Sequence, residues 1–332
     1  MKILKLGVIG CGLAYERLHL PALKKLKDYY EVASLCDIDL NRVEEMAKKT
    51  KIKTDHIYRD YQEMINKENL DLILVCVPIP EQERIYEELI HINIPFIAEK
   101  PFATTYDTAK RLRDLSKKNN TEILVAENYR FSEDTLLLKK IIDEKKIGDI
   151  LYVLNVKADN FIVDKTKDTF ASTKWRQYPT YPGGSYLDGG VHDIARLHYL
   201  FGSVNEMITF AKDESDEHVP YRLITSKILF DQGVTAEYTY YSNESALIDP
   251  PIGFRMFGTK GQAYLKDSDS GKIILTNYNE EKEVLTYKTK KGYYNELVHF
   301  YEVLVNNKQN ECSPDVEIED IKIIETALNK NW

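Results

Sequence analysis

One glycine-rich segment holds two side chains that are well suited to moving a proton. Residues 183–193 read Gly-Gly-Ser-Tyr-Leu-Asp-Gly-Gly-Val-His-Asp. Asp188 and His192 are four residues apart, so they share one face if a helix has begun by then. An imidazole with its ordinary pKa of about 6.5 can take a proton from a hydroxyl group, while a carboxylate orients the ring or binds a neighbouring hydroxyl. A helix cap at Asp188 and a packed core histidine would account for the same residues equally well.

A lysine directly before a proline is the second candidate. Glu99-Lys100-Pro101 follows a short apolar run at residues 94–98, and ligands of open α/β sheets bind at the carboxyl ends of strands. Because proline restricts the preceding residue to extended backbone, the ammonium of Lys100 projects from a stiff segment. It could grip a substrate hydroxyl and lower the pKa of that hydroxyl. Taken alone, an exposed charged pair before a turn is the commoner explanation.

A glycine loop near the start of the chain predicts a site for a dinucleotide. Gly10-Cys11-Gly12-Leu13-Ala14-Tyr15 follows an apolar run and opens a helix. Glycines at positions 10 and 12 allow a tight turn and a close approach of the pyrophosphate, and the helix N-terminus offers unpaired N–H groups. Tyr15 replaces the third small residue of this pattern. We therefore expect either a shifted helix or a side chain that points along the cofactor groove.

The carboxylate at the end of the second apolar run favours NAD over NADP. Asp37 stands about where the adenosine ribose hydroxyls are received, and its charge would repel a 2′-phosphate. Arg42, about one helical turn further on, could soften that preference. Alternatively, Asp37 caps the helix that begins near Leu40, and both roles are compatible.

Unbroken apolar runs in the first part of the chain predict parallel strands covered on both faces. They lie at residues 3–10, 31–37, 72–77, 94–98 and 122–126. Helical patterns separate them, for example at residues 41–49 and 81–92. The alternation of strand and helix predicts an α/β domain with a doubly wound parallel sheet over residues 1–125, a Rossmann domain that binds NAD(P).

The pattern changes after that point. Apolar residues alternate with polar ones at residues 150–158, 221–230 and 234–241, as in a sheet with one covered and one open face. Helices are expected at residues 132–146, 293–305 and 317–328. We therefore expect an α+β domain over residues 126–332, built on an open and mostly antiparallel sheet.

Composition excludes several classes of protein. The 332 residues include 45 Lys and Arg against 53 Asp and Glu, a net charge of −8 that argues against a nucleic-acid binder. No apolar run approaches the roughly 18–20 residues of a membrane span. The four cysteines, at positions 11, 36, 76 and 312, show no metal-binding spacing. Free thiols, no metal and a cytoplasmic location are the resulting expectations.

Together these motifs resemble the Gfo/Idh/MocA family, named for glucose–fructose oxidoreductase and inositol dehydrogenase. The resemblance covers nearly the whole chain, and its most specific part is Glu-Lys-Pro combined with Gly-Gly-x-x-x-Asp-x-x-x-His. The segments that carry it are Gly10-Cys11-Gly12, residues 19–23, Asp37, Val77-Pro78, Glu99-Lys100-Pro101, residues 127–130, Trp175-Arg176, residues 183–192 and residues 257–261. The family implies NAD(P)-dependent oxidation or reduction of sugars, cyclitols and related polyols.

By position, Lys100, Asp188 and His192 match the family's catalytic lysine, aspartate and histidine. The resemblance adds Val77, Pro78 and Glu99 to the expected cofactor site. The expected pocket for a sugar or polyol adds four side chains: Tyr129, Arg130, Trp175 and Arg176. It also implies a homodimer or homotetramer, because the family's open second-domain sheet commonly buries one face against another copy.

The resulting hypothesis is a dehydrogenase in which His192 takes the hydroxyl proton while hydride leaves the same carbon for NAD. A non-catalytic protein of the same fold, binding NAD and a sugar to regulate a partner, is the alternative. Such relatives usually lose the lysine or the histidine, and both are present here. A methyltransferase that binds S-adenosylmethionine shares the glycine loop, but Lys100-Pro101 and the alternating second half fit it poorly.

Overall fold

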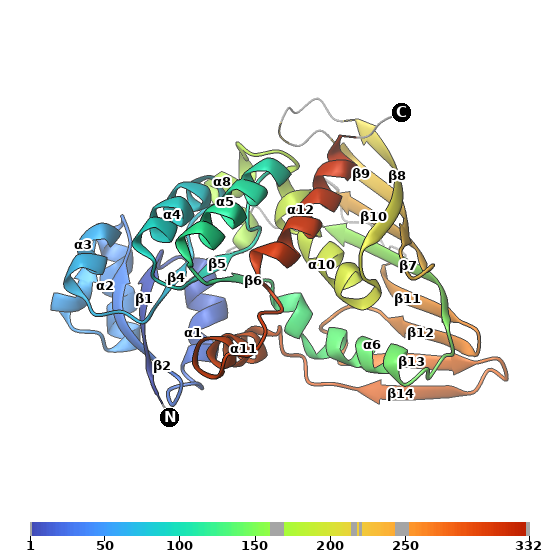
Figure 1. Cartoon of the computed structure of the whole chain (residues 1–332). Helices are drawn as coiled ribbons and strands as arrows, with labels where there is room; N and C mark the ends of the chain where they lie inside the picture. Colours follow the sequence, from blue (N-terminus) through green and yellow to red (C-terminus); the bar gives the residue numbers. More distant parts are fainter. Residues whose placement is uncertain (1, 160–168, 214–217, 219–220, 243–251, 330–332) are drawn as a thin grey trace. The chain divides into compact units, whose positions relative to one another are not determined.

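A computed structural model of the chain is shown in Figure 1, and it describes residues 2–159, 169–213, 218, 221–242 and 252–329. The chain forms two compact units. The first consists of Met1–Glu127 and Tyr293–Ile321, and the second of Asn128–Gly292 and Lys322–Trp332. Within the described residues, no helix combines the length and the apolar character that a membrane crossing requires.

A six-stranded sheet forms the centre of the first unit. Its strands are β1 (Leu4–Ile9), β2 (Tyr30–Cys36), β3 (Ile57–Tyr58), β4 (Leu72–Val75), β5 (Phe96–Glu99) and β6 (Ile123–Ala126). They run parallel in the order β3-β2-β1-β4-β5-β6. Every residue of β4, β5 and β6 is buried, as the unbroken apolar runs predict. The expected doubly wound sheet is confirmed, and its strand order reverses between β1 and β4, where such folds bind ligands.

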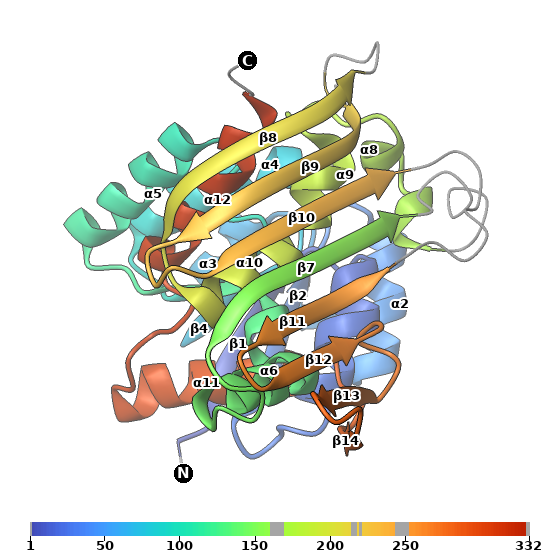
Figure 2. The same cartoon turned by 90° about the vertical axis from the view of Figure 1, so that its right-hand side faces the viewer.

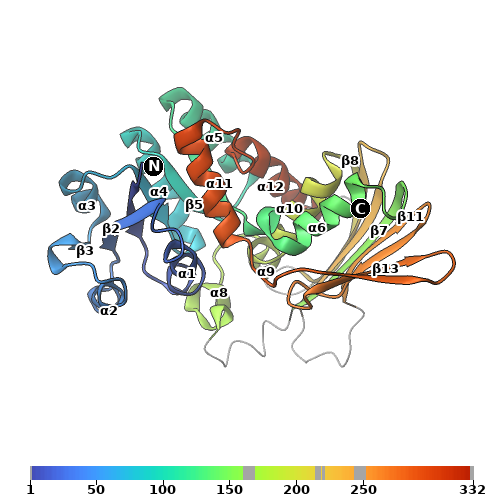
Figure 3. The ribbon, with the colours of Figure 1, turned by 90° about the horizontal axis from the view of Figure 1, so that it is seen from below.

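Helices complete the first unit. They are the π-helix η1 (Tyr15–His19), α1 (Leu20–Leu23), α2 (Leu40–Thr50), the 3₁₀ turn η2 (Thr54–His56), α3 (Tyr61–Lys67), α4 (Ile79–Ile92), α5 (Tyr106–Asn119), α11 (Tyr293–Asn306) and most of α12 (Pro314–Leu328). Although α11 is distant in sequence, it contacts α1 and β6 (Figure 3). The hydroxyl of Tyr30 donates to the carbonyl of Leu297 at 2.6 Å, which fixes α11 to the end of the sheet.

The second unit is built on an eight-stranded sheet. Its strands are β7 (Ile150–Asp159), β8 (Val204–Asp213), β9 (Tyr221–Phe230), β10 (Thr235–Ser242), β11 (Gly253–Gly258), β12 (Gly261–Leu265), β13 (Lys272–Asn277) and β14 (Lys282–Thr286). Their order is β14-β13-β12-β11-β7-β10-β9-β8, and all neighbours are antiparallel except β7 and β10. The mostly antiparallel sheet expected from the alternating pattern is thus confirmed.

Short helical elements also belong to the second unit, and the last two of them in chain order contact one face of this sheet. These elements are η3 (Asn128–Phe131), α6 (Glu133–Asp143), η4 (Phe170–Ser172), α8 (Lys174–Gln177), α9 (Gly184–Asp188) and α10 (Gly190–Phe201). On β10, Tyr238 and Tyr240 are buried, and the Tyr240 hydroxyl donates to the carbonyl of Ser185 at 3.0 Å. Figure 2 shows the opposite face of the sheet, to which the alternate residues of each strand belong.

Gly10, at the end of β1, is required by its surroundings. It has φ of +92°, and a Cβ atom there would clash with the backbone carbonyl of Cys76. Gly12 does not share this constraint, because the nearest heavy atom to a Cβ there would be Nη1 of Arg42 at 3.8 Å. The two glycines therefore differ in what they contribute to stability.

We expect Gly10→Ala to lower the free energy of unfolding by roughly 1–3 kcal/mol, because the new Cβ clashes with the Cys76 carbonyl and alanine is strained at this positive φ. The unfolding temperature should fall by several degrees in differential scanning calorimetry. Gly12→Ala is the matched control and should unfold within about one degree of the wild type. Equal unfolding temperatures for Gly10→Ala and the wild type would contradict this role of Gly10.

Candidate active site

The glycine loop and Asp37 form one hydrogen-bonded structure. The backbone N–H of Cys11 donates to Oδ2 of Asp37 at 2.8 Å, and that of Asp39 donates to Oδ1 at 2.9 Å. The Gly10 N–H donates to the carbonyl of Cys36, so the loop is also fixed to the end of β2. A carboxylate offers about four lone-pair positions, so Asp37 retains acceptor capacity for the hydroxyls of a ribose.

The residue that caps the helix beginning at Leu40 is not Asp37. The N–H of Asn41 donates to Oδ1 of Asp39, and Asp39 is the N-cap of α2. The interpretation of Asp37 as the cap is therefore wrong. Arg42, in the first turn of α2, is exposed and its guanidinium lies beside Gly12, where a phosphate bound by the loop would meet a positive charge.

Tyr15 is fully buried, so the expectation that it points along the cofactor groove is wrong. The other alternative, a shifted helix, agrees with the structure, because residues Tyr15–His19 form a π-helix instead of an α-helical turn. Among the described residues the Tyr15 hydroxyl has no hydrogen-bond partner. Burial raises the pKa of this phenol far above its ordinary value, so Tyr15 acts as a packed aromatic residue.

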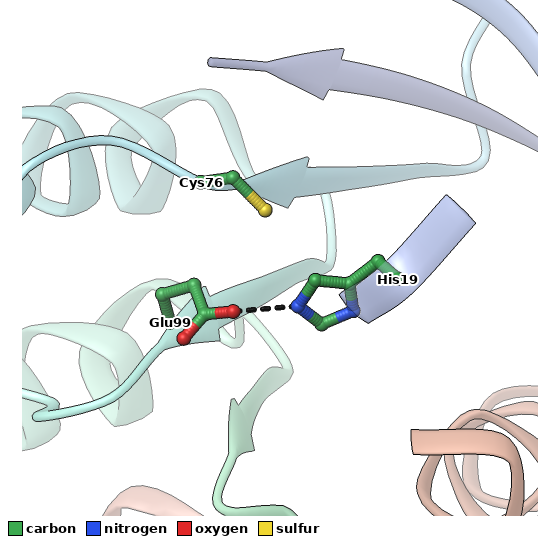
Figure 4. Close-up of side chains that lie close together, drawn as sticks. All are labelled: His19, Cys76 and Glu99. Carbon is green, nitrogen blue, oxygen red and sulfur yellow. Dashed lines mark hydrogen bonds and ion pairs between the residues drawn. The ribbon is translucent and has the colours of Figure 1, made fainter. Parts of the chain in front are cut away.

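A buried pair of side chains connects η1 to the segment that contains Lys100. Nε2 of His19 lies 2.5 Å from Oε1 of Glu99, and both residues are buried (Figure 4). The N–H of Lys100 is 3.2 Å from Oε2 of Glu99, and the Tyr86 hydroxyl donates to the Glu99 carbonyl at 2.9 Å. The Lys100–Pro101 peptide bond is cis. Glu99 therefore joins the end of the π-helix to the backbone of Lys100.

Cys76 lies beside this pair, and one donor atom from each of the three residues lies within 4.8 Å of the other two (Figure 4). Two ligands of a tetrahedral zinc ion, each about 2.0–2.1 Å from the metal, stand roughly 3.3 Å apart. The 2.5 Å contact between His19 and Glu99 is a hydrogen-bond distance instead. Burial raises the pKa of Cys76 well above its ordinary value, which keeps the group a thiol. This geometry describes a hydrogen-bonded pair next to a thiol.

Sequence reasoning assigned no role to His19 beyond its place in the family motif. The contact depends on the fold, because η1 and the end of β5 are separated by 80 residues along the chain. A histidine next to the apolar Leu20-Pro21-Ala22-Leu23 segment resembles a core residue. Its hydrogen-bond partner, the buried carboxylate of Glu99, becomes apparent only in the folded structure.

The second unit brings together three of the predicted residues. Nε of Arg176 donates to Oδ2 of Asp188 at 2.6 Å, and both side chains are largely buried. The Arg176 guanidinium carbon also lies 4.0 Å from the ring centroid of Trp175. An arginine that bonds a carboxylate while resting on an indole has a defined orientation.

Asp188 and His192 lie on two helices, not one. Asp188 is the last residue of α9, Gly189 separates the helices, and His192 lies in the first turn of α10. The condition for a shared helical face, a helix that has already begun at Asp188 and continues to His192, is therefore not met. A Cβ on Gly190 would lie 3.1 Å from the Tyr238 hydroxyl, so the glycine allows α10 to approach the sheet closely.

His192 stacks on Tyr129, with ring centroids 4.4 Å apart and planes inclined by 13°. Both side chains are half-buried, whereas the neighbouring Arg130 is buried. Lys100 is half-buried in the first unit, so the predicted catalytic residues are divided between the two units. Val77 and Pro78 follow β4 at the same edge of the parallel sheet as Glu99.

Comparison with known proteins identifies the family. The NAD-binding Rossmann-fold model of the GFO_IDH_MocA oxidoreductase family matches residues 4–127, and the C-terminal alpha/beta domain model of that family matches residues 139–330. A solved structure of an oxidoreductase from Thermotoga maritima superposes with a TM-score of 0.86 at 27% identity, covering 99% of this chain and 97% of that chain.

Among curated proteins, the uncharacterized protein YMR315W of Saccharomyces cerevisiae is 26% identical over 273 residues, 81% of this chain and 76% of that protein. Two oxidoreductases of Schizosaccharomyces pombe match over only 57% of their own length. The myo-inositol 2-dehydrogenase of Thermotoga maritima is 24% identical over 287 residues, 82% of this chain and 78% of that enzyme. With both domain models matched in order, the chain belongs to the Gfo/Idh/MocA family of oxidoreductases and carries its NAD-binding Rossmann fold.

Proposed function

We propose that the protein is an NAD-linked dehydrogenase that oxidises a hydroxyl-bearing carbon of a sugar or cyclitol. The observation that carries this proposal is the bonding of the Asp37 carboxylate to the glycine loop, where the strand order of the sheet reverses. The similarity to an enzyme named myo-inositol 2-dehydrogenase supports the substrate class. The four cysteines are buried as thiols, which is consistent with a cytoplasmic protein.

The proposed cofactor site follows the carboxyl edge of the parallel sheet. The pyrophosphate would be held by the backbone of residues 10–14, and the adenosine ribose by Asp37. Val77, Pro78 and Glu99 would border the nicotinamide end. The bound nicotinamide supplies the acceptor for hydride. The chain's own task at this edge is to fix the position of that ring and to exclude water around it.

The proposed reaction removes a hydride from carbon and a proton from the attached oxygen, leaving a carbonyl group. His192 accepts the proton, and the ammonium of Lys100 donates a hydrogen bond to the same oxygen as its charge develops. Asp188, held by Arg176, binds a neighbouring hydroxyl or orients the imidazole. Arg130 and Trp175 complete the proposed pocket. The second unit would thus supply most substrate contacts, as a substrate-binding domain.

We also propose that the open face of the eight-stranded sheet pairs with a second copy of the chain. On β8, Ile208 and Phe210 are more than half exposed, and they stand opposite Lys227 and Thr225 of β9 on this face. Apolar residues gathered on one sheet face are typical of an interface between proteins. A dimer or tetramer would cover them.

Phe210→Asp should weaken this assembly, because it places a charge in the proposed apolar interface. Light scattering after size-exclusion chromatography should show an oligomer for the wild type and a lower average mass for the variant. Ile92→Asp, an exposed position on α4, is the control and should keep the wild-type mass. A monomeric wild-type protein would contradict the proposal.

The cofactor preference is tested at Asp37. Calorimetry should show tighter binding of NAD than of NADP to the wild type, and Asp37→Ser should reduce NAD affinity by about 10–100-fold, the loss of charge-assisted hydrogen bonds to the ribose. The preference between the two cofactors should then disappear. Asp39→Asn, which retains a capping side chain two residues away, should leave the preference unchanged. Stronger binding of NADP to the wild type would overturn the assignment.

The proton acceptor is tested at His192. His192→Ala should reduce kcat by about 10²–10⁴-fold on the best substrate of a panel of sugars and inositols, followed at the NADH absorbance band. NAD affinity should stay within about two-fold. His198→Ala, further along α10, is the control and should keep turnover near the wild-type rate. Turnover of His192→Ala at the wild-type rate would eliminate His192 as the base.

A further inference from the structure

The Tyr129 ring that stacks on His192 also contacts the guanidinium of Arg196. The guanidinium carbon of Arg196 lies 4.8 Å from the centroid of the Tyr129 ring. Arg196 follows His192 by four residues on α10, so the two side chains project from the same side of the helix. The Tyr129 ring, which comes from η3, thus contacts the imidazole and the guanidinium of one helix.

Arg196 cannot move freely, because it belongs to a buried ion pair. Its Nη2 donates to Oδ2 of Asp134 at 2.6 Å, and its Nε donates to the hydroxyl of Thr135 at 2.9 Å. The same Asp134 oxygen accepts from Ser268 at 2.6 Å. Burial alone would raise the pKa of Asp134, but Arg196 and the nearby hydroxyls hold it below its ordinary value. The pair is therefore charged, and its side chains are at most 5% exposed.

These contacts form a connected series from Asp134 through Arg196 and Tyr129 to His192. A proton acceptor must stay within a few tenths of an ångström of its productive position, and a displacement of 1 Å costs about 100-fold in rate. A half-buried imidazole at the start of a helix needs a neighbour to set its ring plane. The nearly parallel ring of Tyr129 provides that neighbour.

We propose that Tyr129 is a positioning residue for His192 that acts through its aromatic ring, and that the buried Asp134–Arg196 pair holds this ring in place. This inference rests on the proposed function, since it gives His192 a reaction to perform. It differs from the pocket role expected for Tyr129, in which the side chain contacts the substrate. The ring, and not the phenolic hydroxyl, is the part of Tyr129 that matters.

The test compares Tyr129→Phe, which keeps the ring, with Tyr129→Met, which replaces it by a flexible apolar chain of similar length. With the best substrate of the sugar and inositol panel, Tyr129→Phe should retain kcat and KM within about two-fold. Tyr129→Met should lose about 10–100-fold in kcat with NAD affinity unchanged. If Tyr129→Phe raises the KM for substrate as strongly as Tyr129→Met does, the hydroxyl binds substrate and the proposal is overturned.

A second measurement does not depend on catalysis. In protein labelled with ¹³C-histidine, the ring proton of His192, assigned with His192→Gln, should be shifted upfield by the Tyr129 ring current. The shift should persist in Tyr129→Phe and vanish in Tyr129→Met, with circular dichroism checking that both variants are folded. An unshifted wild-type resonance would refute the stack. A shifted resonance in a protein that oxidises nothing in the panel would refute the proposed function and leave the stack standing.

Should Tyr129→Met fail to fold, Tyr129→Phe still decides between ring and hydroxyl, because the two roles predict opposite results for it. Tyr129→Trp adds a larger ring at the same position and should preserve both the upfield shift and most of the turnover. Loss of the shift in Tyr129→Trp, with the protein folded, would count against a role carried by aromatic stacking.

Discussion

The buried contact between His19 and Glu99 is the interaction on which the arrangement of the first unit's site depends. His19 ends the π-helix that follows the glycine loop, and Glu99 is the residue before Lys100. One hydrogen-bonded pair therefore couples the segment proposed to hold the pyrophosphate to the lysine proposed to hold the substrate hydroxyl. Loss of Glu99 would leave Nε2 of the buried His19 without this hydrogen bond, which costs about 1–3 kcal/mol.

The second unit also fixes the orientation of its proposed catalytic side chains, but it does so by ring stacking and an ion pair. It places His192 by stacking on an aromatic ring and Asp188 by a direct ion pair with Arg176. Stacking fixes the plane of an imidazole without occupying either ring nitrogen, whereas a hydrogen bond would consume one of them. Because only one ring nitrogen exchanges a proton with the substrate, such stacking is compatible with a hydrogen bond at the other nitrogen. The supporting ion pair, Asp134–Arg196, contacts the ring of Tyr129 through the guanidinium of Arg196.

The fold could be predicted from the sequence wherever the burial of a strand produces a regular pattern of apolar residues. Strands covered on both faces are apolar throughout, so β4, β5 and β6 were expected, and the alternation along β10 indicated a sheet with one covered face. The two-residue strand β3 is too short to leave such a pattern. The helix that holds Asp188 ends before Gly189, so it does not continue to His192, and Gly190 then allows α10 to approach the sheet closely.

The site was harder to predict than the fold. Its contacts join residues that are far apart in the sequence, and no local sequence pattern indicates that they meet. The π-helix illustrates the difficulty. A tyrosine where the glycine loop normally carries a small residue was expected to distort the helix or to point outward, and the sequence could not choose. Tyr15 is the first and His19 the last residue of the π-helix, and both are buried, with His19 in contact with the carboxylate of Glu99. The departure from the usual pattern at Tyr15 and the buried histidine four residues later thus belong to one short element, which is rare in proteins.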